Sequence, residues 1–537
     1  MSIENTPPLR DNQEQSIKLT LKAFDEGVDS VVIQAPTGTG KTLISRFLAE
    51  PYGSTLVGVP TKQLQDQYAK ELIPTGGVKV LKGKSNYYCT IEGRGVLPVS
   101  EASCQFETSR KQIRTCMENK NCPYIEAKLE AQASKIAVLS FAGQLSWAQF
   151  APIFFGIRDL HIIDEAHKME DIVRDHFSIV QTESEIRRQM GKHAKLLPKM
   201  PEKGGQEEIL SYLRDCSAVC VEKLADMQKI YECETLEELF IKAEDSLLLS
   251  LNLNPILKFK GNIDELFRGL NEDTDSYVAY LEMREGKKTK KWEPSLVTKP
   301  VHLQSLVERF VRGNKTVFMS ATIIGVESWA KSMGLENYKF IDVPSTFPAK
   351  NRRVFFTPIG NLNSTNISKL VPQGCELLRK IRRHPELSKQ KGLVHTPSYA
   401  LTEIIEQEMK DDPNLIFGRK GDPSALQKHL QSTEPTLLIG PAYKEGIDLK
   451  DDLCRVQIVW KAAYKNPNDP LVLKKGKTDP LWETRQMVAD FIQQIGRGVR
   501  SKEDWAVTYV FDGNLQRLLL KFRALVPSYI WESFQNI

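Results

Sequence analysis

The sequence predicts an α/β protein whose sheets are parallel and covered by helices on both faces. Short apolar runs rich in β-branched residues recur along the 537 residues, and segments of helical composition separate most of them. This alternation is typical of parallel sheets, because two parallel strands need a crossover connection between them. The predicted strands are 31–34, 55–59, 136–139, 160–163, 316–319, 392–395, 436–439 and 456–459.

Length and composition favour a globular protein of several units. At roughly 150 residues per domain, the chain is long enough for three or four of them. Its hydrophobic content of 41% and net charge of +5 exclude a disordered chain and reveal no polybasic tail. The first eleven residues show no secretion signal, so we expect a cytoplasmic or nucleoid-associated protein. We predict the uncharged stretch 138–157 to be a strand and a buried helix rather than a membrane span.

The first motif with a chemical meaning is Ala-Pro-Thr-Gly-Thr-Gly-Lys-Thr at 35–42, which follows the strand 31–34 and opens a helix. Glycines let backbone N–H groups close around phosphate oxygens, and the helix N-terminus adds positive partial charge. Lys41 would reach the β- and γ-phosphates and Thr42 would ligate Mg²⁺. Ala35 replaces the Gly of the strict motif, but the strand-loop-helix context favours nucleotide binding over a structural turn. The predicted nucleotide-binding residues of this loop are Thr37, Gly38, Thr39, Gly40, Lys41 and Thr42.

A second motif, Asp-Glu-Ala-His at 164–167, directly follows the predicted strand 160–163. In α/β folds this end of a strand carries the groups that contact ligands. We therefore predict that Asp164 holds Mg²⁺ and that Glu165 polarises the water that attacks the γ-phosphate. His167 is expected to couple the site to neighbouring motifs.

A third motif, Gln-x-x-Gly-Arg-x-x-Arg, lies near the C-terminal end of the chain and contains Gln493, Arg497 and Arg500. Arginines three positions apart share one face of a helix, where their planar guanidinium groups can make bidentate contacts to a polyphosphate. We predict that these three residues complete one catalytic site with Lys41 and the 164–167 motif.

Four of the nine cysteines, Cys89, Cys104, Cys116 and Cys122, lie within 34 residues. In a chain without a secretion signal such a cluster favours a metal site over disulfides. Structural zinc sites usually contain a cysteine pair separated by about two to four residues, whereas the separations here are 14, 11 and 5 residues. An iron–sulfur cluster fits this spacing better, and zinc or free thiols remain alternatives. The thiols expected to be structural are Cys216, Cys220, Cys233, Cys375 and Cys454.

These motifs, together with Ser-Ala-Thr at 320–322 and Gly-Ile-Asp at 446–448, occur in the order that is typical of superfamily 2 helicases. The cysteine segment precedes the 164–167 motif and a long helical segment follows it, and with these two insertions the chain resembles the XPD/DinG family over essentially its whole length. The resemblance implies two RecA-like P-loop motor domains with an inserted Fe-S cluster domain and an inserted helical arch domain. The implied boundaries are 1–83, 126–170 and 296–343 for motor domain 1, 84–125 for the cluster domain, 171–295 for the arch and 344–537 for motor domain 2.

The resemblance also implies ligands for particular residues. A [4Fe-4S] cluster would be bound by the four clustered cysteines. Arg10 and Gln13 would read the adenine of ATP, and Asp448 would approach the nucleotide from motor domain 2. Thr61 and Thr396 would donate hydrogen bonds to the phosphates of single-stranded DNA, which positions a strand without reading its sequence.

The activity that the resemblance implies is unwinding of DNA, driven by ATP and Mg²⁺, by a monomeric motor that moves 5′ to 3′ on single-stranded or forked DNA. Ser320 and Thr322 would couple hydrolysis to strand movement, and no membrane takes part. Alternatives are a translocase that remodels complexes without separating strands, a non-catalytic DNA-binding subunit of a larger repair or interference complex, and a motor that acts on RNA. The intact ATP motifs argue against a non-catalytic role.

Overall fold

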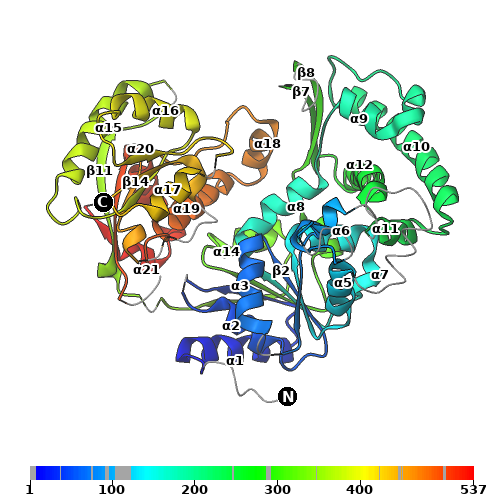
Figure 1. Cartoon of the computed structure of the whole chain (residues 1–537), viewed down its shortest axis with the longest axis horizontal. Helices are drawn as coiled ribbons and strands as arrows, with labels where there is room; N and C mark the ends of the chain where they lie inside the picture. Colours follow the sequence, from blue (N-terminus) through cyan, green and yellow to red (C-terminus); the bar gives the residue numbers. More distant parts are fainter. Residues whose placement is uncertain are drawn as a thin grey trace.

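A computed structural model of the chain contains two α/β domains and a helical insertion (Figure 1). Each α/β domain is built on a seven-stranded sheet, and a three-stranded sheet belongs to the insertion. This architecture confirms the predicted α/β class with two parallel-sheet units. The structure describes residues 8–36, 38–73, 76–90, 96–102, 122–244, 247–285, 292–345, 347–363, 365–422, 424–444, 449, 451–499 and 503–536.

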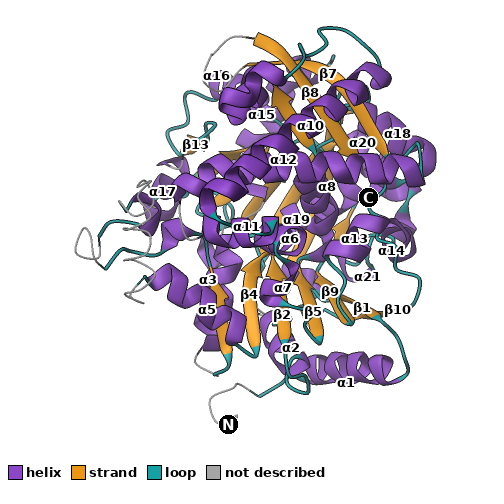
Figure 2. Cartoon of the chain, turned by 90° about the vertical axis from the view of Figure 1, so that its right-hand side faces the viewer, coloured by secondary structure: helices purple, strands orange, loops and turns teal. Residues whose placement is uncertain are grey.

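The first domain is built on a sheet with the strand order β10-β1-β9-β5-β2-β4-β3, in which all described pairings are parallel. Its strands are β1 (Ser30–Gln34), β2 (Thr55–Val59), β3 (Val78–Leu81), β4 (Ile136–Ser140), β5 (Leu160–Asp164), β9 (Lys315–Ser320) and β10 (Tyr338–Asp342). Its helices are α1 (Asp11–Asp25), α2 (Lys41–Leu48), α3 (Lys62–Leu72), α5 (Pro123–Ala133), α6 (Phe141–Phe150), α7 (Pro152–Phe155), α8 (Met169–Phe177), α13 (Gln304–Phe310) and α14 (Val326–Ser332). Every residue of β1 and β2 is buried, because helices cover both faces of the sheet (Figure 2).

The second domain is built on a sheet with the order β13-β14-β12-β15-β16-β11-β17, which is also parallel. Its strands are β11 (Arg352–Gly360), β12 (Gly392–His395), β13 (Leu415–Phe417), β14 (Leu437–Gly440), β15 (Val456–Val459), β16 (Ala506–Asp512) and β17 (Phe534–Gln535). Its helices are α15 (Ile367–Arg382), α16 (Tyr399–Glu408), α17 (Ser424–Gln431), α18 (Pro470–Thr478), α19 (Trp482–Ile495), α20 (Gly513–Lys521) and α21 (Ser528–Trp531). Two large buried rings, Trp460 and Phe511, pack edge to face in its core.

The helical insertion leaves the first domain after α8 and returns before α13. It consists of β6 (Ile179–Thr182), α9 (Glu183–Met190), α10 (Gln206–Tyr231), α11 (Leu236–Glu244), α12 (Leu247–Glu272), β7 (Tyr277–Glu285) and β8 (Trp292–Pro300). The three strands form an antiparallel sheet in the order β6-β8-β7. Apolar side chains of α10 and α12 share one core with α5 and α6, so the insertion is packed firmly against the first domain.

The second domain contacts the insertion as well as the first domain. Lys474 of α18 donates a hydrogen bond from Nζ to the carbonyl oxygen of Tyr277, at 3.1 Å. Next to this contact, Leu471 of α18 packs against Val278 and Val301 of the insertion. In Figure 1 the α18 helix accordingly projects from the second domain towards β7 and β8.

All eight strands predicted from the sequence are present, each within one residue of its expected ends. The uncharged stretch 138–157 contains the end of β4 followed by α6 and α7. No helix in the described part of the chain is both long enough and apolar enough to cross a membrane.

A buried glycine in α15 gives a stability prediction for the second domain. A Cβ atom on Gly374 would lie 2.4 Å from Cζ2 of Trp460, so Gly374→Ala should lower the free energy of unfolding by about 1–3 kcal/mol through overpacking. Gly476→Ala in α18 is the matched control, because its Cβ atom would meet nothing within 4 Å and should add up to about 1 kcal/mol of helix propensity. Thermal unfolding of both variants tests this, and equal shifts would contradict the close contact.

Candidate active site

The phosphate loop lies between β1 and α2, at the C-terminal ends of the parallel strands of the first sheet. Its backbone is anchored to the neighbouring strand, because Ala35 N–H donates to the carbonyl oxygen of Ser320 at 2.8 Å. Gly38 and Gly40 have φ angles of +81° and +82°, a region that other residues rarely adopt. A Cβ atom on Gly40 would also lie 2.4 Å from Nε2 of Gln13. Glycine at position 40 is therefore required both by the backbone and by its neighbour.

Arg10 and Gln13, which are predicted to read adenine, are bound to the same loop. Gln13 is 3% exposed and donates from Nε2 to the carbonyl oxygen of Thr39 at 2.7 Å. Arg10 donates to the carbonyl oxygen of Gly38 at 2.9 Å and from its backbone N–H to Gln13 Oε1 at 2.8 Å. Their contact with adenine stays a prediction, and in this structure both residues position the phosphate loop.

The two carboxylates that follow β5 have opposite electrostatic environments. Asp164 is 2% exposed, and burial raises its pKa to about 6 even though Lys41 acts to lower it. Tyr68 donates to Asp164 Oδ2 at 3.0 Å, and the backbone N–H of Glu165 donates to Oδ1 at 2.8 Å. For Glu165, burial is outweighed by Lys41 and His167, which hold its pKa well below the usual range. This separation of two neighbouring carboxyl groups is typical of acid–base sites.

Glu165 is held in its orientation by both its backbone and its side chain. Its φ angle is +52°, a left-handed conformation that costs a residue other than glycine roughly 1–2 kcal/mol. Such strain persists only where the surroundings enforce it. Here Oε1 lies 3.1 Å from Lys41 Nζ, and Oε2 lies 3.3 Å from Nδ1 of His167. The carboxylate of Glu165 thus connects the phosphate loop to the coupling residues.

A series of close polar contacts runs from Glu165 into the second domain. Nδ1 of His167 lies 2.8 Å from Ser320 Oγ, which accepts from the backbone N–H of Thr322 at 3.1 Å. Thr322 Oγ1 in turn accepts from Gln493 Nε2 at 2.7 Å. Gln493 belongs to α19 of the second domain, so the structure brings together four of the predicted motifs. Arg497 lies just beyond the C-terminal end of α19. It lines a cavity of about 60 Å³ together with Pro36 of the phosphate loop.

Three predicted nucleotide or catalytic residues, Thr37, Asp448 and Arg500, lie outside the described residues. The two predicted DNA contacts are described: Thr61 is the N-cap residue of α3, and Thr396 directly follows β12, two residues before Ser398, the N-cap residue of α16. Thr61 caps α3 by accepting from Leu64 N–H at 3.3 Å. Thr396 is buried, with its hydroxyl 2.7 Å from that of Thr402. Their role in DNA binding stays a prediction.

The cysteine segment is described only in part, and Cys104 and Cys116 fall outside it. Cys89 and Cys122 are both buried, and Cys122 is the N-cap residue of α5. No group of three or more His, Cys, Asp or Glu side chains among the described residues is arranged to hold a metal ion. Burial raises the pKa of Cys216 and of Cys220 to about 12, which agrees with a structural role for these two thiols.

Two residues beside the site were not predicted from the sequence. Tyr68 connects Ser45 of α2, at 2.8 Å, to Asp164, and Gln67 donates to Thr42 Oγ1 at 3.3 Å. Both come from α3, whose sequence carries no catalytic motif. The contact between Tyr68 and Asp164 spans 96 residues, so no local pattern could reveal it.

Comparison with known protein families finds two matches that together cover most of both α/β domains. Residues 6–190 match the family described as type III restriction enzyme, res subunit, and residues 381–526 match the helicase C-terminal domain. Among curated proteins, the chain is 22% identical to the ATP-dependent DNA helicase YoaA of Escherichia coli K12, over 94% of this chain and 91% of that protein. It is also 22% identical to YoaA of Haemophilus influenzae, over 90% of this chain and 88% of that protein.

Solved structures show the same fold. An XPD helicase superposes with a TM-score of 0.61 at 16% identity, over 96% of this chain and 98% of that one. Xpd4 of S. tokodaii superposes with a TM-score of 0.59 at 14% identity, over 98% and 99% of the two chains. In the order of its motifs, its two matched domains and its fold, the chain is similar to the XPD-like helicases of superfamily 2.

Proposed function

We propose that this protein is an ATP-dependent DNA helicase that couples ATP hydrolysis to movement along single-stranded DNA and to separation of a duplex. The observation that carries the proposal is the series of ion-pair and hydrogen-bond contacts from Lys41 through Glu165 and Thr322 to Gln493, because it connects the phosphate loop to the second domain. The name of the YoaA relatives, ATP-dependent DNA helicase, supports DNA as the substrate.

Hydrolysis would use residues from both α/β domains. Lys41 would bind the β- and γ-phosphates, and Thr42 and Asp164 would hold Mg²⁺, which neutralises phosphate charge when bound. Glu165 would orient the attacking water, and its low pKa keeps it ionised as an acceptor. Arg497, with Arg500, would approach the phosphates from the second domain. Arginines supplied in this way contribute about 10³ to 10⁵ in kcat, so hydrolysis would require closure of the two domains.

Nucleotide binding would change the contacts of Glu165. In this structure Glu165 shares its two oxygens between Lys41 and His167. Phosphate oxygens would compete for Lys41, and Glu165 would then depend more on His167. His167 contacts Ser320, and Thr322 contacts Gln493. A change in the contacts of Glu165 would therefore reach α19 through these side-chain contacts.

We propose that single-stranded DNA crosses both α/β domains near Thr61 and Thr396. Thr61 follows β2 of the first sheet, and Thr396 follows β12 of the second. Helix N-termini such as those of α3 and α16 attract phosphates. A grip of this kind loses affinity as salt rises, because binding releases counterions from the strand.

We also propose a [4Fe-4S] cluster held by Cys89, Cys104, Cys116 and Cys122. Support comes from the burial of both described thiols and from the position of Cys122 at a helix N-terminus, which favours a thiolate. Cluster ligation would fix this segment against the insertion, which it already touches where Tyr124 donates to Glu244 at 3.0 Å.

A translocase that remodels complexes without separating strands is the second candidate. It would use the same ATP site and the same strand path, and would differ in whether the insertion parts a duplex. A non-catalytic binding subunit is disfavoured, because Lys41, Asp164 and Glu165, the residues that hydrolysis would use, lie together at one site.

The first prediction of this function concerns hydrolysis. Lys41→Ala should remove ATP binding and turnover. Glu165→Gln should lower kcat by at least about 100-fold while ATP still binds, because the carboxylate acts on the water. DNA-stimulated phosphate release measures turnover, and a fluorescent ATP analogue measures binding. Wild-type turnover in Glu165→Gln would contradict the assigned role.

A second prediction concerns the direction of movement. Duplexes with either a 5′ or a 3′ single-stranded tail should be offered together with ATP. We expect unwinding of the 5′-tailed duplex alone, and slower unwinding as salt is raised. Displacement of a bound protein without strand separation would favour the translocase, and unwinding from the 3′ tail would reverse the proposed polarity.

A third prediction concerns the cluster. Cys122→Ser should abolish the brown absorbance of the anaerobically purified protein, together with its bound iron and sulfide. Cys216→Ser is the control, because Cys216 is equally buried but lies in α10 of the insertion. Full iron content in Cys122→Ser would remove Cys122 from the ligand set.

A further inference from the structure

A buried cluster of charged and aromatic side chains joins the two α/β domains beside the active site. At its centre is Glu170 of α8, whose Oε1 lies 2.8 Å from Arg174 and 3.4 Å from Lys475 of α18. From α19, Trp482 donates Nε1–H to Glu170 Oε1 at 2.7 Å, and Gln486 donates to Oε2 at 3.2 Å. One carboxylate of the first domain therefore binds three side chains of the second.

The cluster is buried, and its one carboxylate is paired with two cations. Glu170, Arg174, Lys475 and Trp482 are each 2–4% exposed. Burial alone would raise the pKa of Glu170, but Arg174 and Lys475 hold it at about 2. Both cations also lie near the face of the Trp482 ring, 5.7 Å and 5.8 Å from its centroid. Parting the two domains here would separate Lys475 from its carboxylate and Trp482 from its hydrogen-bond acceptor, which costs more than losing a surface ion pair.

The cluster sits at one end of the helix whose other end bears the catalytic residues. Trp482 and Gln486 lie in the first turns of α19, and Gln493 lies eleven residues after Trp482, on the same helical face. Towards its far end α19 contacts the first domain through a hydrogen bond between the uncharged side chains of Gln493 and Thr322, and Ile324 of the first domain shares an apolar cluster with Phe491 and Ile492. The described contacts of α19 with the first domain therefore involve buried charges at one end and uncharged groups at the other.

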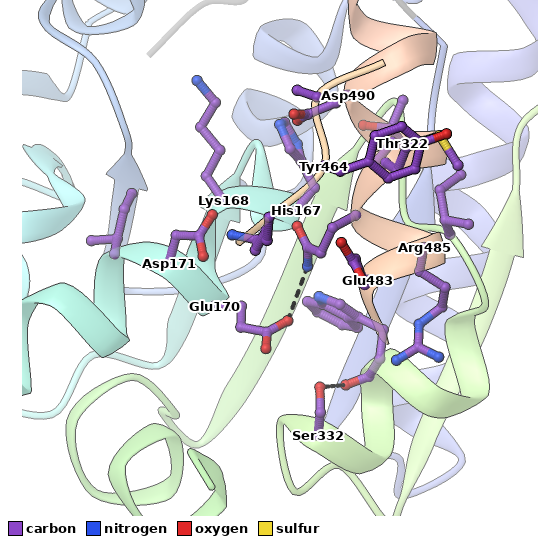
Figure 3. A pocket seen from close by; sticks show the side chains of 18 residues that line it. His167, Lys168, Glu170, Asp171, Thr322, Ser332, Tyr464, Glu483, Arg485 and Asp490 are labelled. Carbon is purple, nitrogen blue, oxygen red and sulfur yellow. Dashed lines mark hydrogen bonds between the residues drawn. The ribbon is translucent and has the colours of Figure 1, made fainter. Parts of the chain in front are cut away.

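Between the two attachments lies a cavity of about 420 Å³, which gives the helix room to move. Figure 3 shows this cavity, with Glu170 at one side and His167 and Thr322 at another. At a rise of 1.5 Å per residue, Gln493 is about 17 Å from Trp482 along α19. A rotation of about 10° around the buried end would move Gln493 by about 3 Å, enough to make or break its contact with Thr322.

We propose that Glu170 and Trp482 are positioning residues that form the pivot between the two α/β domains, and that rotation about this pivot sets the approach of Arg497 to the nucleotide. The proposal rests on the proposed function, since it assigns the cluster a part in ATP hydrolysis. The pivot stays closed through the cycle, while the contact of Gln493 with Thr322 is exchanged.

The test compares two buried glutamates that pair with arginines. Glu170→Gln keeps the shape of the side chain and removes its charge. Because ATP is bound mainly by the first domain, its affinity should change by less than about threefold, whereas kcat should fall about 10- to 100-fold from misplacement of Arg497. Glu265→Gln is the matched control, since Glu265 is also buried and pairs with Arg309, but within the insertion and first domain only. Its kcat should equal that of the wild type.

Wild-type kcat in Glu170→Gln would overturn the pivot, and so would equal losses of kcat and affinity in both variants. If Glu170→Gln does not fold, Trp482→Phe replaces it, because phenylalanine keeps a ring and loses only the N–H donor; an unchanged kcat would again overturn the proposal. If the wild type itself lacks ATPase activity, the proposed function fails. The pivot is then tested separately, by counting the thermal unfolding transitions in a calorimeter. Glu170→Gln should then unfold in two transitions where the wild type shows one, and a single transition would refute it.

Discussion

The shared carboxylate of Glu165 is the constraint on which the active site depends. It binds Lys41 through one oxygen and His167 through the other, and a left-handed backbone conformation directs it between them. Two adjacent parallel strands make this possible, because the acidic pair lies at the C-terminal end of β5 and Ser320 lies at the C-terminal end of β9. Burial raises the pKa of Asp164 while cations lower that of Glu165, so the two neighbouring carboxyl groups differ in how readily they ionise.

The two α/β domains meet through contacts of contrasting chemistry. Around Glu170, buried ion pairs are supported by several hydrogen-bond partners, whereas Gln493 and Thr322 share a hydrogen bond between uncharged side chains. The insertion adds a third contact through α18 and β7. A motor needs this combination, because domains that must reopen on every cycle cannot be held by strong contacts everywhere.

The sequence could predict most of the interior strands and the motif residues, but only some of the contacts among them. The predicted strands are covered on both faces and read as continuous apolar runs. The missed strands include β11 and β16 inside the second sheet and the edge strands β3, β10, β13 and β17 of the two large sheets. Charged residues interrupt the apolar pattern of β3 and β10, and β13 and β17 are only three and two residues long. Within the site, the phosphate loop and the 164–167 motif are short continuous stretches of sequence and can be recognised from it. Tyr68 and Trp482 are not, because their partners lie 96 and 312 residues away in the chain.

The strand order of the first sheet has a consequence for synthesis of the chain on the ribosome. The fully buried strand β1 lies between β9 and β10, and β9 begins about 280 residues after β1 ends. At about 5–20 residues per second, an apolar strand would wait for roughly 15–55 seconds before either neighbour has been made. During that interval β1 has neither of its strand partners, and an exposed apolar strand of this kind favours association with other unfolded chains. The phosphate loop follows β1, and the neighbouring strand β9 is translated only after the insertion. The loop therefore cannot reach its final structure until the insertion has been translated.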